Sequence, residues 1–200
     1  MFEEVKRRYV RELAEETLEN LRKRGWITFY AENAEECKAE VSEILRGVKR
    51  VGIPGSVTVR ELGLIQLLKE NGFEVVEHWN TKSVEEANKL RREEVFCEAF
   101  IHSPNAVSAD GHLVVLDYYG NRIAGSILGP EKLVFIAGYN KIESCLERAI
   151  ERAEKVAVKL NAMRFGIPVE EMKYNVLILK IKPPAIKEGY VILVGEPLGF

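Results

Sequence analysis

The segment from Arg50 to Glu77 constrains the fold most, because it predicts a strand, a helix and a second strand in immediate succession. Arg50 to Ile53 and Phe73 to Glu77 have the apolar character of short strands. Between them, Leu62, Ile65 and Leu68 recur at the spacing of an amphipathic helix that ends at Asn71-Gly72. Strands joined through such a helix are normally parallel neighbours in one sheet. This unit therefore favours an α/β fold.

The rest of the chain extends the same pattern. Further helices are predicted over Val5–Leu21, Asn33–Leu45, Ser83–Glu94 and Ile142–Met163, and further strands over 26–30, 99–102, 113–116, 123–127, 133–137, 176–181 and 190–194. Thr58 and Glu61 have the spacing of a capping box, which places the start of one helix at Thr58. We expect a three-layer domain with a mostly parallel sheet, helices on both faces and an antiparallel excursion. We expect residues 1–25 to form a helix packed on or beside the core and residues 26–200 to form a single domain.

Composition narrows the classes of function. The chain has 200 residues, 46% of them hydrophobic, which is enough for a full core. Lys and Arg total 29 against 31 Asp and Glu, so the charge lacks the basic excess expected for nucleic-acid binding. We find neither an apolar run long enough to span a bilayer nor a secretory signal, and therefore expect a cytoplasmic protein. The predominance of Glu, Lys and Arg, with Gln66 as the only glutamine, is typical of a thermophile.

Cysteine and histidine spacing argues against a metal centre. Cys37, Cys97 and Cys145 are far apart and form no CxxC pair, so neither a disulfide framework nor an iron–sulfur or zinc site is expected. The three histidines show no HxH or HExxH spacing. We therefore expect no intrinsic cofactor, and the roles of the three cysteines stay open.

The stretch from Asn105 to Lys141 separates short apolar segments with many turn residues. Glycines stand there at positions 111, 120, 125, 129 and 138, each next to polar side chains. Polar loops between strands are typical of the rim of an α/β binding site. The alternative is a β-meander with ordinary tight turns, and the residues alone favour that alternative.

Two blocks, VGIPGSVTVRELG and NAVSADGHLVVLDYYGNRIAGSILGPEKLVFIAGYNKI, resemble the lactate-utilisation (LUD) domain family in order, spacing and unusual turns. The resemblance runs from about the second helix to the segment Gly195–Phe200. It implies a fold similar to ribose-5-phosphate isomerase, glucosamine-6-phosphate deaminase and the CoA transferases. Some members of the family belong to an iron–sulfur complex that oxidises L-lactate to pyruvate. Many relatives carry a cysteine-rich stretch where this chain reads MRFGIPVEEMKYN, so no role of those cysteines transfers to it.

The loop from Gly52 to Thr58 is the first candidate binding element. Backbone N–H groups and the helix dipole suit such a loop to a phosphate or carboxylate, and the resemblance implies the same, since the equivalent loop holds phosphate in sugar-phosphate members of the fold. The alternative is that Thr58 only caps a helix and Gly55 only makes a turn. Capping by itself also accounts for Glu61, so no catalytic residue is assigned.

Lys141 is the favoured functional cation, since the resemblance implies that its strand end faces the ligand. Asn105 is expected beside the first loop. Arg122 either clamps a carboxylate or pairs with Asp117 at the surface, and Asp110 is better explained as part of a hairpin turn. The full set of candidate ligand-binding residues is Gly52, Gly55, Ser56, Val57, Thr58, Asn105, Asp110, Gly111, Arg122, Gly129, Gly138, Asn140 and Lys141.

Three candidate functions follow. The resemblance implies an accessory component in the oxidation of lactate, or a related 2-hydroxy acid, to pyruvate, with a small anionic ligand bound at the strand ends. The alternatives are a non-catalytic scaffold for iron–sulfur or flavin partner proteins, and an enzyme of the same fold that acts on sugar phosphates or CoA esters. Whether the chain is catalytic or forms a homodimer stays open.

Overall fold

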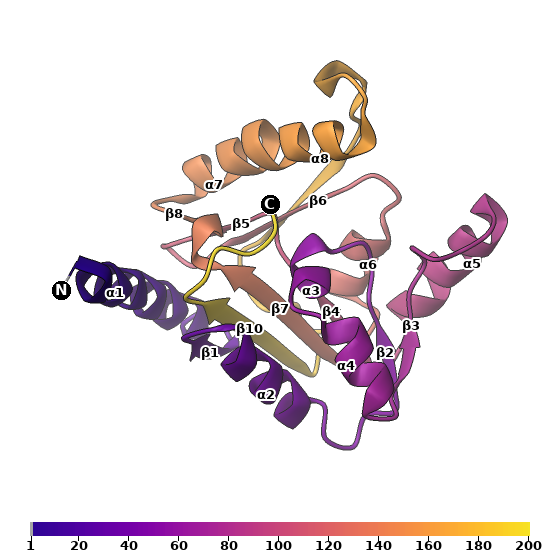
Figure 1. Ribbon diagram of the computed structural model, residues 1–200, viewed down its shortest axis with the longest axis horizontal. Coiled ribbons are helices and arrows are strands. Elements are labelled where there is room, and N and C mark those ends of the chain that lie inside the picture. Colours follow the sequence, from indigo (N-terminus) through magenta and orange to yellow (C-terminus); the bar gives the residue numbers. More distant parts are fainter. Residues whose placement is uncertain (1) are drawn as a thin grey trace.

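Six parallel strands form the larger of two sheets in the computed structural model, which describes residues 2–200 (Figure 1). Their order across the sheet is β1-β10-β7-β4-β2-β3, and every neighbouring pair runs parallel. The expected parallel α/β architecture is thus confirmed. The strands span Ile27–Ala31 (β1), Arg50–Gly52 (β2), Glu74–Val76 (β3), Ala99–His102 (β4), Lys132–Gly138 (β7) and Glu188–Val194 (β10).

The antiparallel strands lie in a separate sheet. Its order is β8-β5-β6-β9, with bounds Ile142–Glu143, Ala106–Ser108, Leu113–Asp117 and Asn175–Leu179. β5 and β6 form a hairpin closed by the bond from the Gly111 amide to the Ser108 carbonyl, 2.8 Å long. Gly111 has a φ of 90°, which L-residues with side chains rarely adopt. The expected hairpin turn at Asp110-Gly111 is therefore confirmed.

Side-chain caps begin three of the helices on the parallel sheet. Asn33 caps α2 (Ala34–Ile44) and Ser83 caps α5 (Val84–Val95), each by accepting the backbone N–H of the third helical residue. The cap of α3 (Val57–Glu61) is Ser56, whose hydroxyl accepts the Val59 N–H. The predicted start at Thr58 was therefore wrong. A left-handed Gly63 separates α3 from α4 (Leu64–Glu70).

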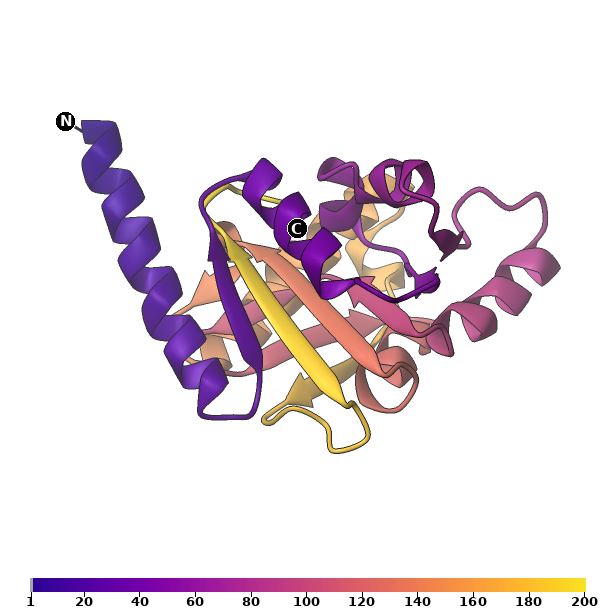
Figure 2. The same ribbon diagram turned by 90° about the horizontal axis from the view of Figure 1, so that it is seen from below.

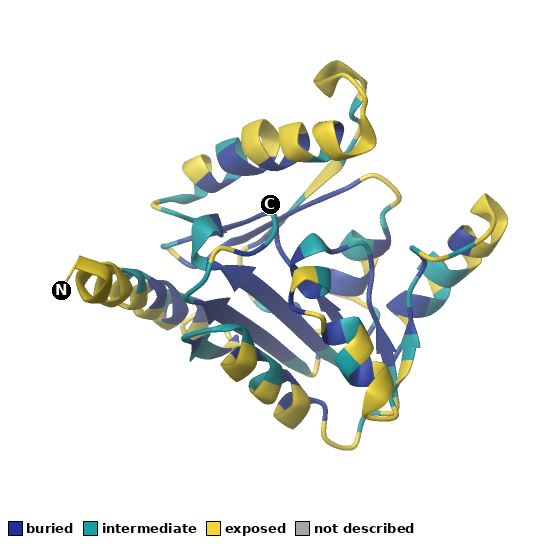
Figure 3. Ribbon diagram, viewed as in Figure 1, coloured by how far each residue is buried: buried dark blue, intermediate teal, exposed yellow. Residues whose placement is uncertain are grey.

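The core lies on both faces of the parallel sheet, as the buried strands in Figure 3 show. Along β7, Val134 and Ile136 pack against α2, α3 and α4. Leu133, Phe135 and Ala137 point to the opposite face, against α1 and the second sheet. A strand buried on both faces explains why β7 is apolar at nearly every position.

The amino-terminal helix α1 (Phe2–Arg22) packs on this second face through its carboxyl-terminal half only. Ala14, Leu18 and Leu21 are buried there, whereas the first turns project from the rest of the molecule (Figure 2). None of the helices formed by residues 2–200 combines the length and apolar character that crossing a lipid bilayer demands.

The long helix predicted from Ile142 begins later and is not uniform. Ile142 and Glu143 pair with β5 as a strand, and a 3₁₀ turn, η1 (Tyr139–Lys141), precedes them. The helix consists of α7 (Leu146–Arg152), a π-helical turn (Ala153–Ala157) and α8 (Val158–Phe165), and a short 3₁₀ turn follows at Val169–Glu171. Ala149, Ala153 and Val158 cover the outer face of the second sheet.

The predicted strand over 123–127 was wrong, because this segment belongs to helix α6 (Asn121–Ile127). Its two isoleucines favoured a strand, but tertiary packing decides otherwise. A Cβ atom at Gly125 would come within 2.3 Å of the Phe100 ring. The glycine thus lets α6 lie directly on β4, which fixes how the residues of α6 approach the sheet.

Candidate functional site

A cavity of about 970 Å³ opens where β2, β4 and β7 end. The loop after β2 contributes Ser56, and the first turn of α3 contributes Thr58. The loop after β4 contributes Ser103 and Asn105, and the turn after β7 contributes Lys141. Because these three strands are adjacent in the sheet, segments remote in the sequence meet at one edge. Ser56, Asn105 and Lys141 therefore line one common space.

Lys141 lies at the centre of this edge. Its side chain is buried, with 1% of the residue exposed. The Nζ atom lies 2.8 Å from the Ser103 hydroxyl, 3.0 Å from the Thr58 hydroxyl and 3.3 Å from the Pro104 carbonyl oxygen. Burial lowers the pKa of Lys141 well below its usual value, and the nearby positive charges of Arg152 and Arg122 lower it further. An anion bound nearby would favour the protonated form of this amine.

Arg122 enters the cavity floor from α6. Its Nη1 donates to the Leu116 carbonyl at 3.0 Å, and its Nη2 donates to the Ser103 carbonyl at 2.5 Å. Burial lowers the pKa of Arg122. The Nε atom is buried and has no partner among residues 2–200. Asp117 accepts the backbone N–H of Arg122 rather than pairing with its guanidinium at the surface.

Asn105 connects these groups. Its side-chain oxygen accepts the Leu116 backbone N–H at 2.8 Å and a weaker bond from Arg122 at 3.3 Å. Arg152 donates to the Asn105 carbonyl at 2.6 Å. With its oxygen engaged in this way, Asn105 has only its amide N–H₂ free to donate to a ligand.

Seven of the thirteen candidate residues line the cavity, and six do not. Those that line it are Gly55, Ser56, Val57, Thr58, Asn105, Arg122 and Lys141; those outside it are Gly52, Asp110, Gly111, Gly129, Gly138 and Asn140. The types of turn residue in the sequence do not distinguish these two groups, because glycine and polar turn residues also occur where elements pack closely together.

Gly52 and Gly129 make room for the end of α5. A Cβ atom at Gly52 would lie 2.0 Å from the Glu94 carbonyl oxygen, and one at Gly129 would lie 2.0 Å from the Val95 carbonyl oxygen. Asp110 and Gly111 lie beside α1, where Arg24 donates to the Asp110 carbonyl at 3.1 Å. Their surroundings account for all four residues without a ligand.

Gly138 and Asn140 lie against the segment that ends at Phe200, and a Cβ atom at Gly138 would lie 2.4 Å from the Leu198 backbone nitrogen. Asn140 accepts the Leu198 N–H at 2.9 Å and donates to the Gly199 carbonyl at 3.2 Å. Glu61, which we expected to cap α3, accepts the Gly199 N–H at 2.5 Å instead. The capping interpretation of Glu61 was therefore wrong. This segment brings Phe200 to the wall of the cavity.

Sequence reasoning missed the wall formed by the β3–α5 segment. His78 and Trp79 stand just after β3, and Arg91 projects from α5. Trp79 lies under Arg60, with the guanidinium 3.8 Å from the ring centroid, and Arg164 of α8 approaches at 5.0 Å. The signal that could have identified His78 is its position at a strand end, the same argument that identified Lys141.

The sequence comparison with family models decides the family. The model of the LUD domain matches residues 14–194.

The chain belongs to the LUD domain family.

A solved structure supports the fold of this LUD domain. The crystal structure of a DUF162 family protein from Deinococcus radiodurans superposes with a TM-score of 0.59 and 15% sequence identity, covering 93% of this chain and 98% of that one. At this identity the similarity concerns the fold alone. None of the curated proteins compared with the LUD domain matches it in sequence. Among residues 2–200, no group of three His, Cys, Asp or Glu side chains is arranged to hold a metal ion.

Proposed function

We propose that the cavity binds an organic-acid or phosphate anion. The observation that carries the proposal is the charge of its walls. Two acidic side chains line the cavity, Asp117 and Glu171. The basic side chains that line it are more numerous: Lys82, Arg91, Arg122, Lys141, Arg164 and Lys173. Low-dielectric walls of one sign attract and retain ligands of the opposite charge.

The family supplies the metabolic setting for this proposal. The LUD domain family is associated with lactate utilisation, so we propose an accessory role in the oxidation of lactate, or a related 2-hydroxy acid, to pyruvate. That oxidation requires an electron acceptor, which a flavin or iron–sulfur partner protein would supply. Within such an assembly, this domain would hold the acid through Lys141 and Arg122.

The size of the cavity favours a second candidate ligand. Its volume of about 970 Å³ lies near the top of the range of roughly 300–1,000 Å³ for sites that enclose drug-sized molecules. A sugar phosphate or a CoA ester would occupy more of this space than lactate does. These larger anions therefore belong in the same test.

Isothermal titration of the purified protein against lactate, pyruvate, sugar phosphates, nucleotides and CoA tests the proposal. Arg91→Gln removes a cation whose buried Nε has no partner among residues 2–200, and we expect the affinity for the bound anion to fall about tenfold. The matched control is Arg92→Gln, because Arg92 is the exposed neighbour on the same helix and lies outside the cavity. The absence of binding to every ligand, or an equal loss of affinity in the two variants, would contradict anion binding in this cavity.

A further inference from the structure

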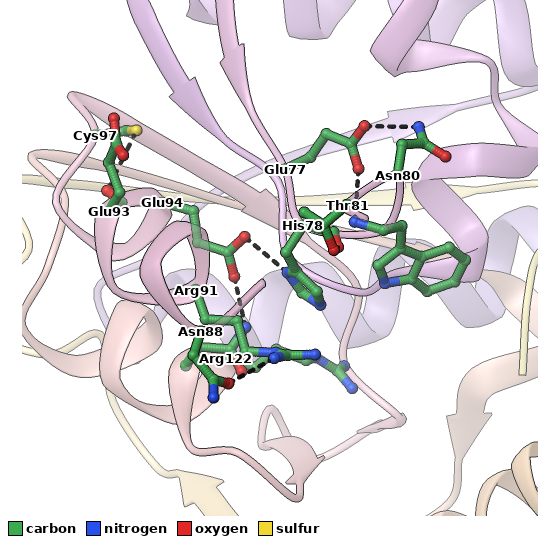
Figure 4. A network of polar contacts seen from close by, with 12 residues as sticks. Glu77, His78, Asn80, Thr81, Asn88, Arg91, Glu93, Glu94, Cys97 and Arg122 are labelled. Atoms are coloured by element: carbon green, nitrogen blue, oxygen red, sulfur yellow. Dashed lines mark hydrogen bonds and ion pairs between the residues drawn. The ribbon is translucent and has the colours of Figure 1, made fainter. Parts of the chain in front are cut away.

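His78 and Glu94 form a hydrogen-bonded pair on the cavity wall (Figure 4). The His78 Nδ1 atom lies 3.0 Å from Glu94 Oε2. Glu94, on α5, is completely buried, and its other oxygen accepts a bond from the Asn121 side-chain amide at 2.5 Å. Both carboxylate oxygens are thus engaged, one by the imidazole and one by α6.

This pairing determines how the imidazole is presented. An ionised carboxylate is an acceptor only, so with Glu94 ionised it is Nδ1 that carries the proton of this hydrogen bond. In that tautomer the lone pair of the ring belongs to Nε2. Burial raises the pKa of Glu94 above its ordinary value, although the bonds from His78 and Asn121 oppose that rise. Those two bonds stabilise the ionised form of the carboxylate, which is the form that orients the ring.

The Nε2 atom is directed away from Glu94. In Figure 4 the second ring nitrogen lies on the side of the imidazole opposite the carboxylate. His78 lines the same cavity as Lys141 and Arg122, and Nε2 makes no hydrogen bond within residues 2–200. A basic nitrogen that is free on the cavity wall is available to a bound ligand. An oriented imidazole backed by a buried carboxylate is the arrangement of a general base.

We propose that His78 is a catalytic acid–base residue for 2-oxo acid anions and that Glu94 is its positioning residue. This inference rests on the proposed function, because the anion must first be held by the basic residues of the cavity. His78 Nε2 takes a proton from the carbon next to the carbonyl group. The electron pair of the broken C–H bond forms a C=C bond, and the carbonyl oxygen becomes an enolate oxygen that the cations stabilise. The imidazolium returns a proton in the reverse step, so no oxidant or reductant is needed.

Pyruvate in D₂O provides the test. Proton removal and return replace the methyl hydrogens by deuterium, which ¹H NMR follows as loss of the methyl signal. We expect the protein to accelerate this exchange over the buffer rate. His78→Asn places an amide near the Nδ1 position, where it can still donate to Glu94, but it removes Nε2, so we expect exchange to fall by a factor of about 10²–10⁴.

The matched control is His112→Asn. His112 also pairs with a carboxylate, Asp110, at 2.9 Å, but it lies on the β5–β6 hairpin outside the cavity, so this variant keeps the exchange rate. Glu94→Gln tests positioning. We expect it to slow exchange about tenfold and to change the ¹⁵N spectrum of His78 from the Nδ1–H tautomer to a mixture.

Titration of pyruvate into the same samples separates the two proposals. Pyruvate binding without accelerated exchange, or exchange that survives His78→Asn, would overturn the role of His78 and leave anion binding intact. Absence of both binding and exchange would overturn the choice of 2-oxo acids, and the proposed function would then depend on the other anions in its own titration. Circular dichroism of each variant confirms that the fold is kept.

Discussion

The amine of Lys141 lies 3.0 Å from the hydroxyl oxygen of Thr58, although 83 positions separate the two residues in the chain. This contact joins the turn after β7 to the first turn of α3, and the Ser103 hydroxyl joins the loop after β4 to the same amine. One side chain therefore connects the ends of three strands. The lowered pKa of Lys141 leads to the first two predictions.

Anion binding should be coupled to proton uptake at Lys141. Burial lowers the pKa of the free protein's Lys141, and an anion nearby favours the ammonium form again. Binding should therefore tighten as pH falls through the range between the two pKa values. Titration calorimetry with pyruvate or inorganic phosphate, in two buffers of different ionisation enthalpy, measures the protons taken up. Lys141→Met should abolish this uptake, whereas Lys187→Met, an exposed residue outside the cavity, should preserve it.

The lowered pKa of Lys141 should also make the stability of the free protein depend on pH. In the unfolded chain Lys141 keeps its proton up to its ordinary pKa, while in the folded protein it loses the proton at lower pH. The unfolded state therefore binds more protons in this window, and the free energy of unfolding rises with pH by up to about 1.4 kcal/mol per unit. The measurement is the difference between wild type and Lys141→Met in urea unfolding at several pH values above neutrality. Parallel pH profiles would contradict the lowered pKa.

Gly199→Ala should loosen the segment that ends at Phe200. Gly199 has a φ of +56°, and a Cβ atom there would lie 2.3 Å from the Thr58 hydroxyl oxygen. We expect a loss of roughly 1–3 kcal/mol in the free energy of unfolding. Gly166→Ala is the control, because Gly166 has a φ of +67° with no atom within 4 Å of the added Cβ. If the two variants lose equal stability, the close approach of the added Cβ atom to Thr58 does not contribute to the loss.

Trp79 should report occupation of the cavity by fluorescence. The indole lies on the cavity wall between Arg60 and Arg164, whereas the other tryptophan, Trp26, packs in the core against Phe135. In a Trp26→Phe background, we expect saturating ligand to shift or quench the emission. The reciprocal variant, which keeps Trp26 and carries Trp79→Phe, should give no response. A signal from Trp26 instead would place the ligand away from this wall.

The parallel sheet could be predicted because its strands are buried on both faces and alternate with capped helices. β7 shows this, since its continuous apolar run leaves little choice of secondary structure. The convergence of Ser56, Asn105 and Lys141 could be predicted for the same reason, since parallel strands end at one edge. The separate second sheet could not, because two-residue strands such as β8 depend on a partner that only the tertiary fold supplies.

Local patterns failed where a side chain has a distant partner. Thr58 and Glu61 fit a capping box, yet Thr58 contacts Lys141 and Glu61 binds the backbone of Gly199. Glycines were equally ambiguous, because Gly52 and Gly129 satisfy close approaches to α5 that sequence spacing does not reveal. The spacing of the histidines does not reveal the role of His78 either, because its partner Glu94 lies 16 residues away on the next helix.

The contact between Gly125 and Phe100 couples two positions that protein engineers would otherwise vary independently. Side-chain volume added at position 125 has to be subtracted at position 100, or α6 is lifted away from the sheet. Since α6 carries Asn121 and Arg122, that displacement would misalign the floor of the cavity and the support of Glu94 together. Among homologous chains, the sizes of these two residues should accordingly vary in opposite directions.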